Sequence, residues 1–254
     1  MSAKPVILLI TGAWHVPEHY SLISNRLRHL GYVVECPRLK TNNNANPPDT
    51  SVDEDIAQIR GLALQHLDQG NHLVAVMHSY GGIVGSNALS GLGSADRPGL
   101  TCVKDLIYIC SFIPFEDESL AGIFGGALPP FLKPNSEGTI DVIDPGHHFY
   151  SDLSLKQQAK WTSRLVRHPT KAQFEAPKQQ NLAAAWKHIP VTYFLCNGDQ
   201  ALPLSVQEMM VNRIEKAEAG LKVSKEYYEA GHSPFLSIPD RVVDVVISRV
   251  KLAV

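Results

Sequence analysis

The sequence has few of the features that mark secreted, membrane-bound or nucleic-acid-binding proteins. It contains four cysteines, Cys36, Cys102, Cys110 and Cys196, and no C-x-x-C pair. Three of them stand in strand-like runs, so we expect buried free thiols in a reducing compartment rather than disulfides or metal ligands. The formal net charge is −2, which argues against binding to nucleic acid or to an anionic membrane.

Long apolar runs are also missing. The first run covers only residues 6–10 and ends in Thr11–Gly12. It is shorter than the apolar region of a signal peptide, so it predicts a first β-strand. No stretch approaches the roughly 20 apolar residues of a transmembrane helix. We therefore expect a cytoplasmic protein.

The apolar pattern of the 254 residues alternates between strands and helices. This alternation predicts an α/β fold with a mostly parallel sheet and helices on both faces. Residues 40–49 are rich in Asn and Pro and predict a surface loop, and Ser51 with Glu54 forms a capping-box pair. The strands are predicted at 6–10, 32–36, 72–77, 105–112, 191–196 and 222–228, and the helices at 20–30, 51–69, 83–89, 205–216 and 240–252.

The pattern changes after residue 113. Glycine and proline pairs at 125–126 and 129–130 break any long element, and a helical pattern returns only at 153–166. The next strand is delayed far beyond an ordinary connection. We interpret residues 114–188 as a helical cap inserted into a core that comprises residues 1–113 and 189–254.

The stretch around Ser79 predicts a catalytic turn. An apolar strand runs into Met77–His78–Ser79–Tyr80–Gly81–Gly82, and small residues that suit a helix follow. This layout is typical of the nucleophile elbow, whose pattern is G-x-S-x-G, although Met77 stands where the first glycine belongs. A strand-to-helix turn with a capping serine is the structural alternative.

Two other polar residues follow strand ends, and with Ser79 they stand in the chain order Ser, Asp, His. Asp199 follows the strand at 191–196, and His232 follows the strand at 222–228. A serine needs a base such as imidazole to take its proton, and the imidazole needs an acceptor on its other nitrogen. Because polar groups at the carboxyl ends of parallel strands share one edge of the sheet, we expect Ser79, Asp199 and His232 to form a catalytic triad.

Each of these choices has a rival. Glu116 and Asp117 follow the strand at 105–112 and are the alternative acids. His78 adjoins Ser79, but neighbouring side chains diverge at a strand end, so we expect it to pack behind the site. For the oxyanion of the tetrahedral intermediate, we expect the backbone N–H groups of Ala13 and Tyr80.

These motifs resemble those of α/β-hydrolases. Thr11–Gly12–Ala13–Trp14–His15 resembles their HGxx loop, with threonine in place of histidine, and His78–Ser79–Tyr80–Gly81–Gly82 resembles their HSxGG elbow. The segments 110–114, 198–203 and 231–232 are similar to the branch of plant methylesterases and hydroxynitrile lyases. The resemblance implies an α/β-hydrolase fold and a hydrolase that needs no cofactor and no metal and acts through an acyl-enzyme.

The lyases of this branch are a distinct alternative. Thr11 resembles a threonine that helps them hold the cyanohydrin. Their mechanism also uses a lysine directly after the catalytic histidine, where this chain has Ser233. The missing cation favours hydrolysis.

Candidate substrate contacts lie near the first loop and in the cap. Gly12, Trp14 and His15 adjoin the expected oxyanion site, and His147 and Phe149 stand in the cap. Trp161 and Trp186 are more typical of helix packing.

The sequence thus predicts a carboxylesterase for a small or medium ester or lactone, with a homodimer as one possible assembly. The alternatives are a lyase or another non-hydrolytic enzyme that reuses the triad, and a receptor-like protein that binds its ligand in the same pocket.

Overall fold

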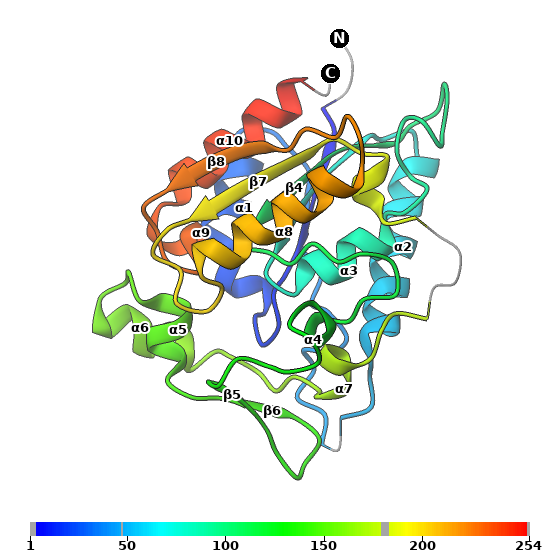
Figure 1. Ribbon diagram of the computed structural model, residues 1–254. Coiled ribbons are helices and arrows are strands. Elements are labelled where there is room, and N and C mark those ends of the chain that lie inside the picture. The colour runs from blue at the N-terminus through cyan, green and yellow to red at the C-terminus, as the bar shows by residue number, and fades with distance from the viewer. Residues whose placement is uncertain (1–3, 47, 179–182, 253–254) are drawn as a thin grey trace.

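A six-stranded parallel sheet forms the centre of the molecule (Figure 1). The computed structural model describes residues 4–46, 48–178 and 183–252. The strands lie in the order β2-β1-β3-β4-β7-β8, and each pairs in parallel with its neighbours. Their bounds are β1 Val6–Ile10, β2 Val34–Glu35, β3 Leu73–His78, β4 Val103–Ile109, β7 Val191–Cys196 and β8 Ser224–Tyr228.

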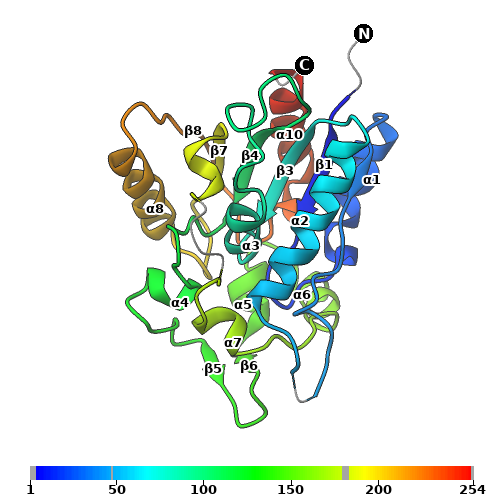
Figure 2. The ribbon, with the colours of Figure 1, turned by 90° about the vertical axis from the view of Figure 1, so that its right-hand side faces the viewer.

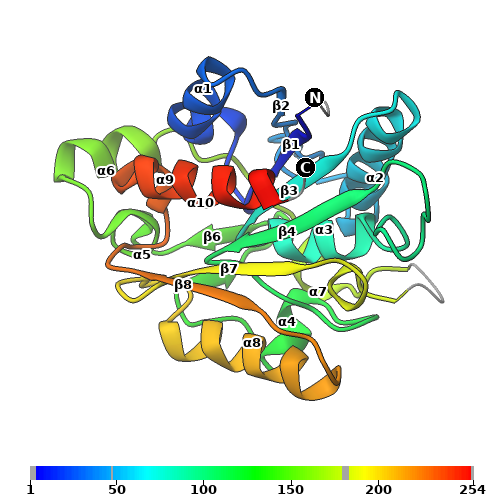
Figure 3. The same ribbon diagram turned by 90° about the horizontal axis from the view of Figure 1, so that it is seen from above.

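Helices cover both faces of this sheet, as the alternating pattern predicts. Helices α1 (Ser21–His29) and α10 (Pro239–Leu252) lie on one face. Helices α2 (Val52–Asp68), α3 (Gly81–Ala88) and α8 (Leu204–Ala217) lie on the other. Figure 2 shows α2 and α3 in front of the sheet and α10 behind it. Figure 3 shows α8 and α10 on opposite sides of β7 and β8. Burial on both faces explains why every residue of β1, β3 and β7 is buried.

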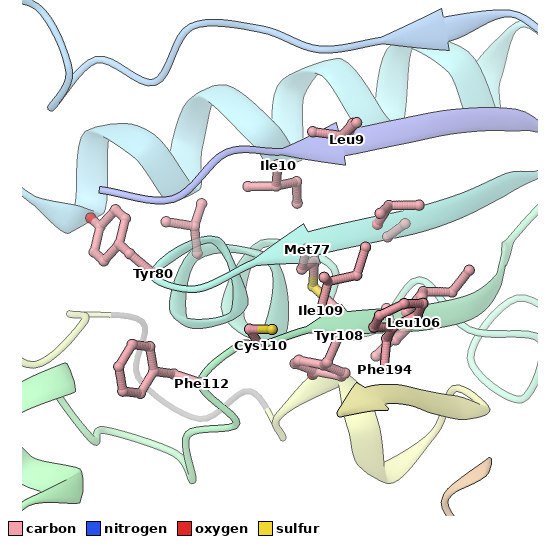
Figure 4. Close-up of a cluster of buried hydrophobic side chains, with 14 of the residues drawn as sticks. Leu9, Ile10, Met77, Tyr80, Leu106, Tyr108, Ile109, Cys110, Phe112 and Phe194 are labelled. Atoms are coloured by element: carbon pink, nitrogen blue, oxygen red, sulfur yellow. The ribbon is translucent and has the colours of Figure 1, made fainter. Parts of the chain in front are cut away.

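The core lies between the central strands and these helices. Figure 4 shows side chains from β1, β3, β4 and β7 gathered in one apolar cluster near the strand ends. The predicted strand at 105–112 ends at Ile109, because Cys110 takes a positive φ of 44° that breaks the strand. The other predicted core elements are present with ends shifted by a few residues.

The predicted cap follows β4, and its residues 114–174 lie across the carboxyl ends of the strands (Figures 1 and 2), whereas its last turn, Ala185–Lys187, packs on α3. It is less helical than the sequence predicted, because β5 and β6 form an antiparallel pair in it and the predicted helix at 153–166 covers only Leu155–Thr162. Its elements are α4 Leu120–Ile123, β5 Leu132–Pro134, β6 Ile140–Val142, α5 Pro145–Tyr150, α6 Leu155–Thr162, α7 Lys171–Phe174 and the 3-10 turn η2 Ala185–Lys187.

Two shorter elements complete the described chain: the 3-10 turn η1 (Pro17–Tyr20) before α1, and α9 (Pro234–Ser237) after β8. Across residues 4–46, 48–178 and 183–252, no helix is both long and apolar enough to cross a bilayer.

Candidate active site

Ser79 occupies a strained turn between β3 and α3. Its φ is +52°, in the left-handed region that a serine rarely adopts. The turn is tight because the following helix starts against the backbone of the next loop: a Cβ on Gly82 would lie 2.0 Å from the carbonyl oxygen of Phe112. The chain therefore holds the Ser79 side chain at the strand end, where it cannot retreat into the core.

Met77 replaces the first glycine of the elbow pattern at no steric cost. Its side chain is fully buried, and its Sδ would lie 2.2 Å from a Cβ on Gly85. The methionine thus fills the space that Gly85 leaves open on α3. The missing glycine is a change of packing that leaves the strained turn in place.

His232 and Asp199 form a buried hydrogen-bonded pair. His232 Nδ1 donates to Asp199 Oδ2 over 2.8 Å, and both residues are at most 4% exposed. Asp199 Oδ1 accepts the backbone N–H groups of Ala201 and Leu202, each at 2.8 Å. These bonds fix the position of the carboxylate. Because the carboxylate accepts a hydrogen bond from the proton carried by His232 Nδ1, the free lone pair of the neutral ring lies on Nε2.

The rival acids lie elsewhere. Glu116 pairs with Lys187 at 2.6 Å and accepts the backbone N–H of Ala184 at 3.0 Å. Asp117 stands in the same loop with a positive φ of 58°. Asp199 is therefore the carboxylate that contacts His232.

Ser79 and His232 line one cavity beneath the cap. Its volume is about 30 Å³. The remaining lining residues are mostly apolar and come from the first loop, the turn after Ser79, the β4 end, the cap and the loop after Asp199: Ala13, Trp14, Tyr80, Phe112, Leu120, Phe124, Pro129, Phe131, Leu132, Phe149, Gln173, Ala201 and Leu202.

A second, open groove lies outside this cavity. Its lining is more polar and includes Asn44, Glu137 and Arg167. Trp14 lines both spaces, and its indole N–H donates to the carbonyl of Ile140 in β6 at 3.1 Å. Trp14 therefore borders both the cavity and the groove.

The loop that carries Ala13 is held by a buried asparagine. Asn42 donates through Nδ2 to the carbonyls of Gly12 and His15 at 3.0 and 2.9 Å, and its Oδ1 accepts the N–H of Trp14 at 3.0 Å. The sequence predicted residues 40–49 as a surface loop, but Asn42 is 0% exposed. The Asn-rich composition of residues 40–49 did not indicate that one asparagine holds the first loop, because a sequence does not distinguish buried from exposed asparagines.

A chain of hydrogen bonds through His78 joins this loop to the catalytic histidine. The Gly12 N–H donates to the Tyr20 hydroxyl at 2.9 Å, which contacts His78 Nδ1 at 2.8 Å. His78 Nε2 lies 2.9 Å from the carbonyl oxygen of His232. A carbonyl only accepts, so Nε2 carries the proton and Nδ1 accepts from Tyr20. His78 thus packs behind the site, as expected, and positions His232.

Burial keeps the surrounding histidines neutral. Desolvation lowers the pKa of His78 well below its usual value, with His232 as the next cause. Desolvation likewise lowers the pKa of His15 well below its usual value, and it lowers that of His168 to about 3. A neutral His78 suits the directed hydrogen-bond chain, because a charged ring would carry a proton on Nδ1 as well and could not accept from the Tyr20 hydroxyl.

The side chain of Tyr80 points away from the catalytic pair. Its hydroxyl donates to Asp55 on α2 at 3.0 Å, and Thr41 donates to the same carboxyl. Burial raises the pKa of Asp55 to about 6. The ring is thereby anchored, and the residue still lines the cavity beside Ser79.

The predicted substrate contacts divide into two groups. Trp14 and Phe149 line the cavity, while Gly12 packs against the elbow, where a Cβ would lie 3.2 Å from that of Ser79. His15 is buried behind the loop, where it donates to the carbonyl of Ala13 at 2.8 Å and contacts Tyr150. His147 is exposed and lies outside the cavity lining.

Two further residues support the catalytic loop, and no motif announced them. Asp152 of the cap accepts the N–H of Gly231 at 2.7 Å, directly before His232. Gln207 on α8 donates to the carbonyl of Leu202 at 2.7 Å and braces the turn that contains Asp199. The contact of Asp152 joins segments 79 residues apart, so local pattern could not predict it. Gln207 and Leu202 are only five residues apart, but a glutamine in a helix carries no signal that it bonds to the preceding loop.

One group of side chains has metal-ligand types. Donor atoms of Cys110, Asp199 and His232 lie within 4.8 Å of one another. However, Asp199 and His232 already pair through these atoms, and burial raises the pKa of the Cys110 thiol well above its usual value. A protonated thiol is a poor ligand, so the group fits a hydrogen-bonded pair better than a metal ion.

Comparison with known proteins agrees with this architecture. The model of the alpha/beta hydrolase family matches residues 7–245. The alpha/beta hydrolase nvfD of Aspergillus novofumigatus (strain IBT 16806) is 33% identical over 96% of this chain and 95% of its own length.

Solved structures share the fold at low sequence identity. A pyrethroid hydrolase from Sphingobium faniae JZ-2 has a TM-score of 0.75 and 17% identity, covering 98% of each chain. The methylesterase MES16 from Arabidopsis has a TM-score of 0.71 and 18% identity, covering 98% of this chain and 99% of its own. The family match across the sheet and the cap, together with the similarity to nvfD, shows that this chain is a member of the alpha/beta hydrolase family.

Proposed function

We propose that the protein is a carboxylesterase that hydrolyses an ester or lactone of a small to medium organic molecule. The observation that carries this proposal is the buried Asp199–His232 pair, whose histidine lines one cavity with a serine held at a φ of +52°. The relatives named as hydrolases and esterases support the same class of reaction. The four free cysteines, three of them buried, support a place inside the cell.

In the proposed reaction, Ser79 Oγ attacks the carbonyl carbon of the ester while His232 Nε2 takes the hydroxyl proton. The N–H groups of Ala13 and Tyr80 donate to the oxyanion that forms. The imidazolium, stabilised by Asp199, then gives its proton to the leaving alcohol, and an acyl-enzyme remains. Water attacks this acyl group with His232 as base, which releases the acid and restores Ser79.

The test is hydrolysis of 4-nitrophenyl acyl esters by Ser79→Ala. We expect this variant to lose all turnover above background, because no other group in the mechanism bonds to the acyl carbon. Ser24→Ala is the matched control, since Ser24 Oγ is buried on α1 without a hydrogen-bond partner in the described chain. Full activity in Ser79→Ala would reject the mechanism.

Labelling with a fluorophosphonate separates the esterase from a receptor-like binder. The proposal requires an adduct on Ser79, and an unlabelled Ser79 would favour the binder. The lyase alternative is checked by cyanide release from a cyanohydrin. Ser233, which stands where the lyases have lysine, is fully buried and brings no positive charge to the site, so we expect none.

A further inference from the structure

Gln173 places an unsatisfied amide at the candidate active site. It lies on α7 of the cap, lines the same cavity as Ser79 and His232, and is 1% exposed. In the described chain, neither its Nε2 nor its Oε1 has a hydrogen-bond partner. Buried amides almost always have partners, so this one requires an explanation.

A second buried glutamine shows what a structural role looks like. Gln207 is 0% exposed, and its Nε2 donates to the carbonyls of Cys196 and Leu202, while its Oε1 accepts the N–H of Cys196. Gln207 is thus satisfied by the fold itself. Gln173 has the same chemistry and similar burial, but residues 4–46, 48–178 and 183–252 offer its side-chain amide no partner.

The surroundings of Gln173 leave a ligand as its natural partner. Most of the cavity is lined by apolar side chains from the cap and the strand ends, including Phe124, Phe131 and Leu132. The elbow and His232 supply the polar groups that the reaction itself uses. A substrate that enters this cavity would therefore meet Gln173 as a polar group that takes no part in the chemistry.

We propose that the Gln173 amide recognises a second polar group of the substrate, away from the scissile ester. Because the N–H groups and the carbonyl oxygen of this amide are both free in the described chain, the matching group has a carbonyl oxygen next to an N–H or O–H, as in a carboxamide or a hydroxy-ketone. The rest of this substrate is apolar, to suit the lining. The inference names a substrate class for the proposed esterase and rests on that function.

The experiment compares 4-nitrophenyl esters that differ only in this group. One series carries a terminal carboxamide, as in the ester of 5-carbamoylpentanoic acid. The other carries an isopropyl group of the same shape, as in the ester of 6-methylheptanoic acid. Both are made with increasing numbers of methylene groups, and kcat/KM is measured for wild type, Gln173→Leu and the exposed control Gln65→Leu.

We expect the ratio of kcat/KM for carboxamide over isopropyl to fall about tenfold or more in Gln173→Leu at the chain length that reaches the amide. Gln65→Leu should keep the wild-type ratio. The melting temperature of Gln173→Leu should equal or exceed that of wild type, since the change removes an unsatisfied buried group. If Gln173 merely supported the fold, Gln173→Leu would lower the melting temperature and leave the carboxamide preference unchanged. Gln173→Met repeats the test with an unbranched side chain.

An unchanged ratio at every chain length would overturn the inference and leave the amide to a bound water. Binding of the intact esters to Ser79→Ala, measured by calorimetry, gives the same comparison without turnover. Loss of the carboxamide preference in this assay on adding Gln173→Leu supports the inference even if the protein is no esterase. Absence of hydrolysis by wild type counts against the proposed function alone.

Discussion

Mild acid should destabilise this protein, because the fold buries neutral histidines. Desolvation lowers the pKa values of His15, His19, His78 and His168 in the folded state. The unfolded chain exposes the same rings, which then titrate near their ordinary pKa of about 6.5. Below that pH the unfolded state binds more protons than the folded state, so stability is complete above about pH 6.5 and is lost as the pH falls.

The size of the loss follows from the number of rings. A histidine that stays neutral when folded and has an unfolded pKa of about 6.5 loses about 1.2 kcal/mol of stability between pH 6 and pH 5. His15, His78 and His168 together give about 3.6 kcal/mol, and His19 adds to this. Asp55 acts in the opposite direction, because its raised pKa of about 6 lets the folded state take up a proton, which offsets about 1 kcal/mol.

The net loss of about 3 kcal/mol is a large part of the stability of an ordinary domain. Urea unfolding at pH 7, 6 and 5 measures it as a fall in the free energy of unfolding. His168→Gln should reduce the difference between pH 6 and pH 5 by about 1.2 kcal/mol, since one titrating ring is gone. Ile214→Val, a buried change without a proton, should lower stability by about 1 kcal/mol equally at both values. A free energy of unfolding that stays constant or rises from pH 6 to pH 5 would refute the reasoning.

Three further changes test the geometry of the site. Trp14→Ala removes the indole of a residue that borders both the cavity and the outer groove, so relative kcat/KM should shift about tenfold or more toward longer acyl chains in a 4-nitrophenyl ester series; an unchanged chain-length profile would contradict this. Tyr20→Phe removes the hydroxyl between Gly12 and His78 and leaves the Gly12 N–H and His78 Nδ1 without a partner, which should cost about 2–6 kcal/mol in urea unfolding; wild-type stability would show the hydrogen-bond chain to be unimportant. Gly82→Ala puts a methyl group 2.0 Å from a backbone carbonyl oxygen, so we expect no soluble active enzyme on expression, and a stable active variant would rule out the tight elbow.

Local pattern was sufficient to predict the core elements. Strands β1, β3 and β7 are continuous apolar runs because helices bury both of their faces, and that signal survives in a sequence. The capping box of Ser51 and Glu54 at the start of α2 could also be predicted, because its geometry needs only four neighbouring residues. The cap resisted prediction because its short elements are held mainly by contacts to distant segments, such as the bond from Trp14 to Ile140.

The sequence by itself determined the alternation of strands and helices, the place of Ser79 at a strand end, and the order in which Asp199 and His232 follow it. These features depend on residue type and spacing along the chain. The tertiary structure decided which carboxylate contacts His232, that Asn42 and His78 hold the site from behind, and that His147 lies outside the cavity. It alone identified Gln173 as a buried amide that has no partner within the described part of the chain. A hydrogen bond between side chains far apart in the chain depends on where folding brings them, and sequence spacing carries no record of that distance.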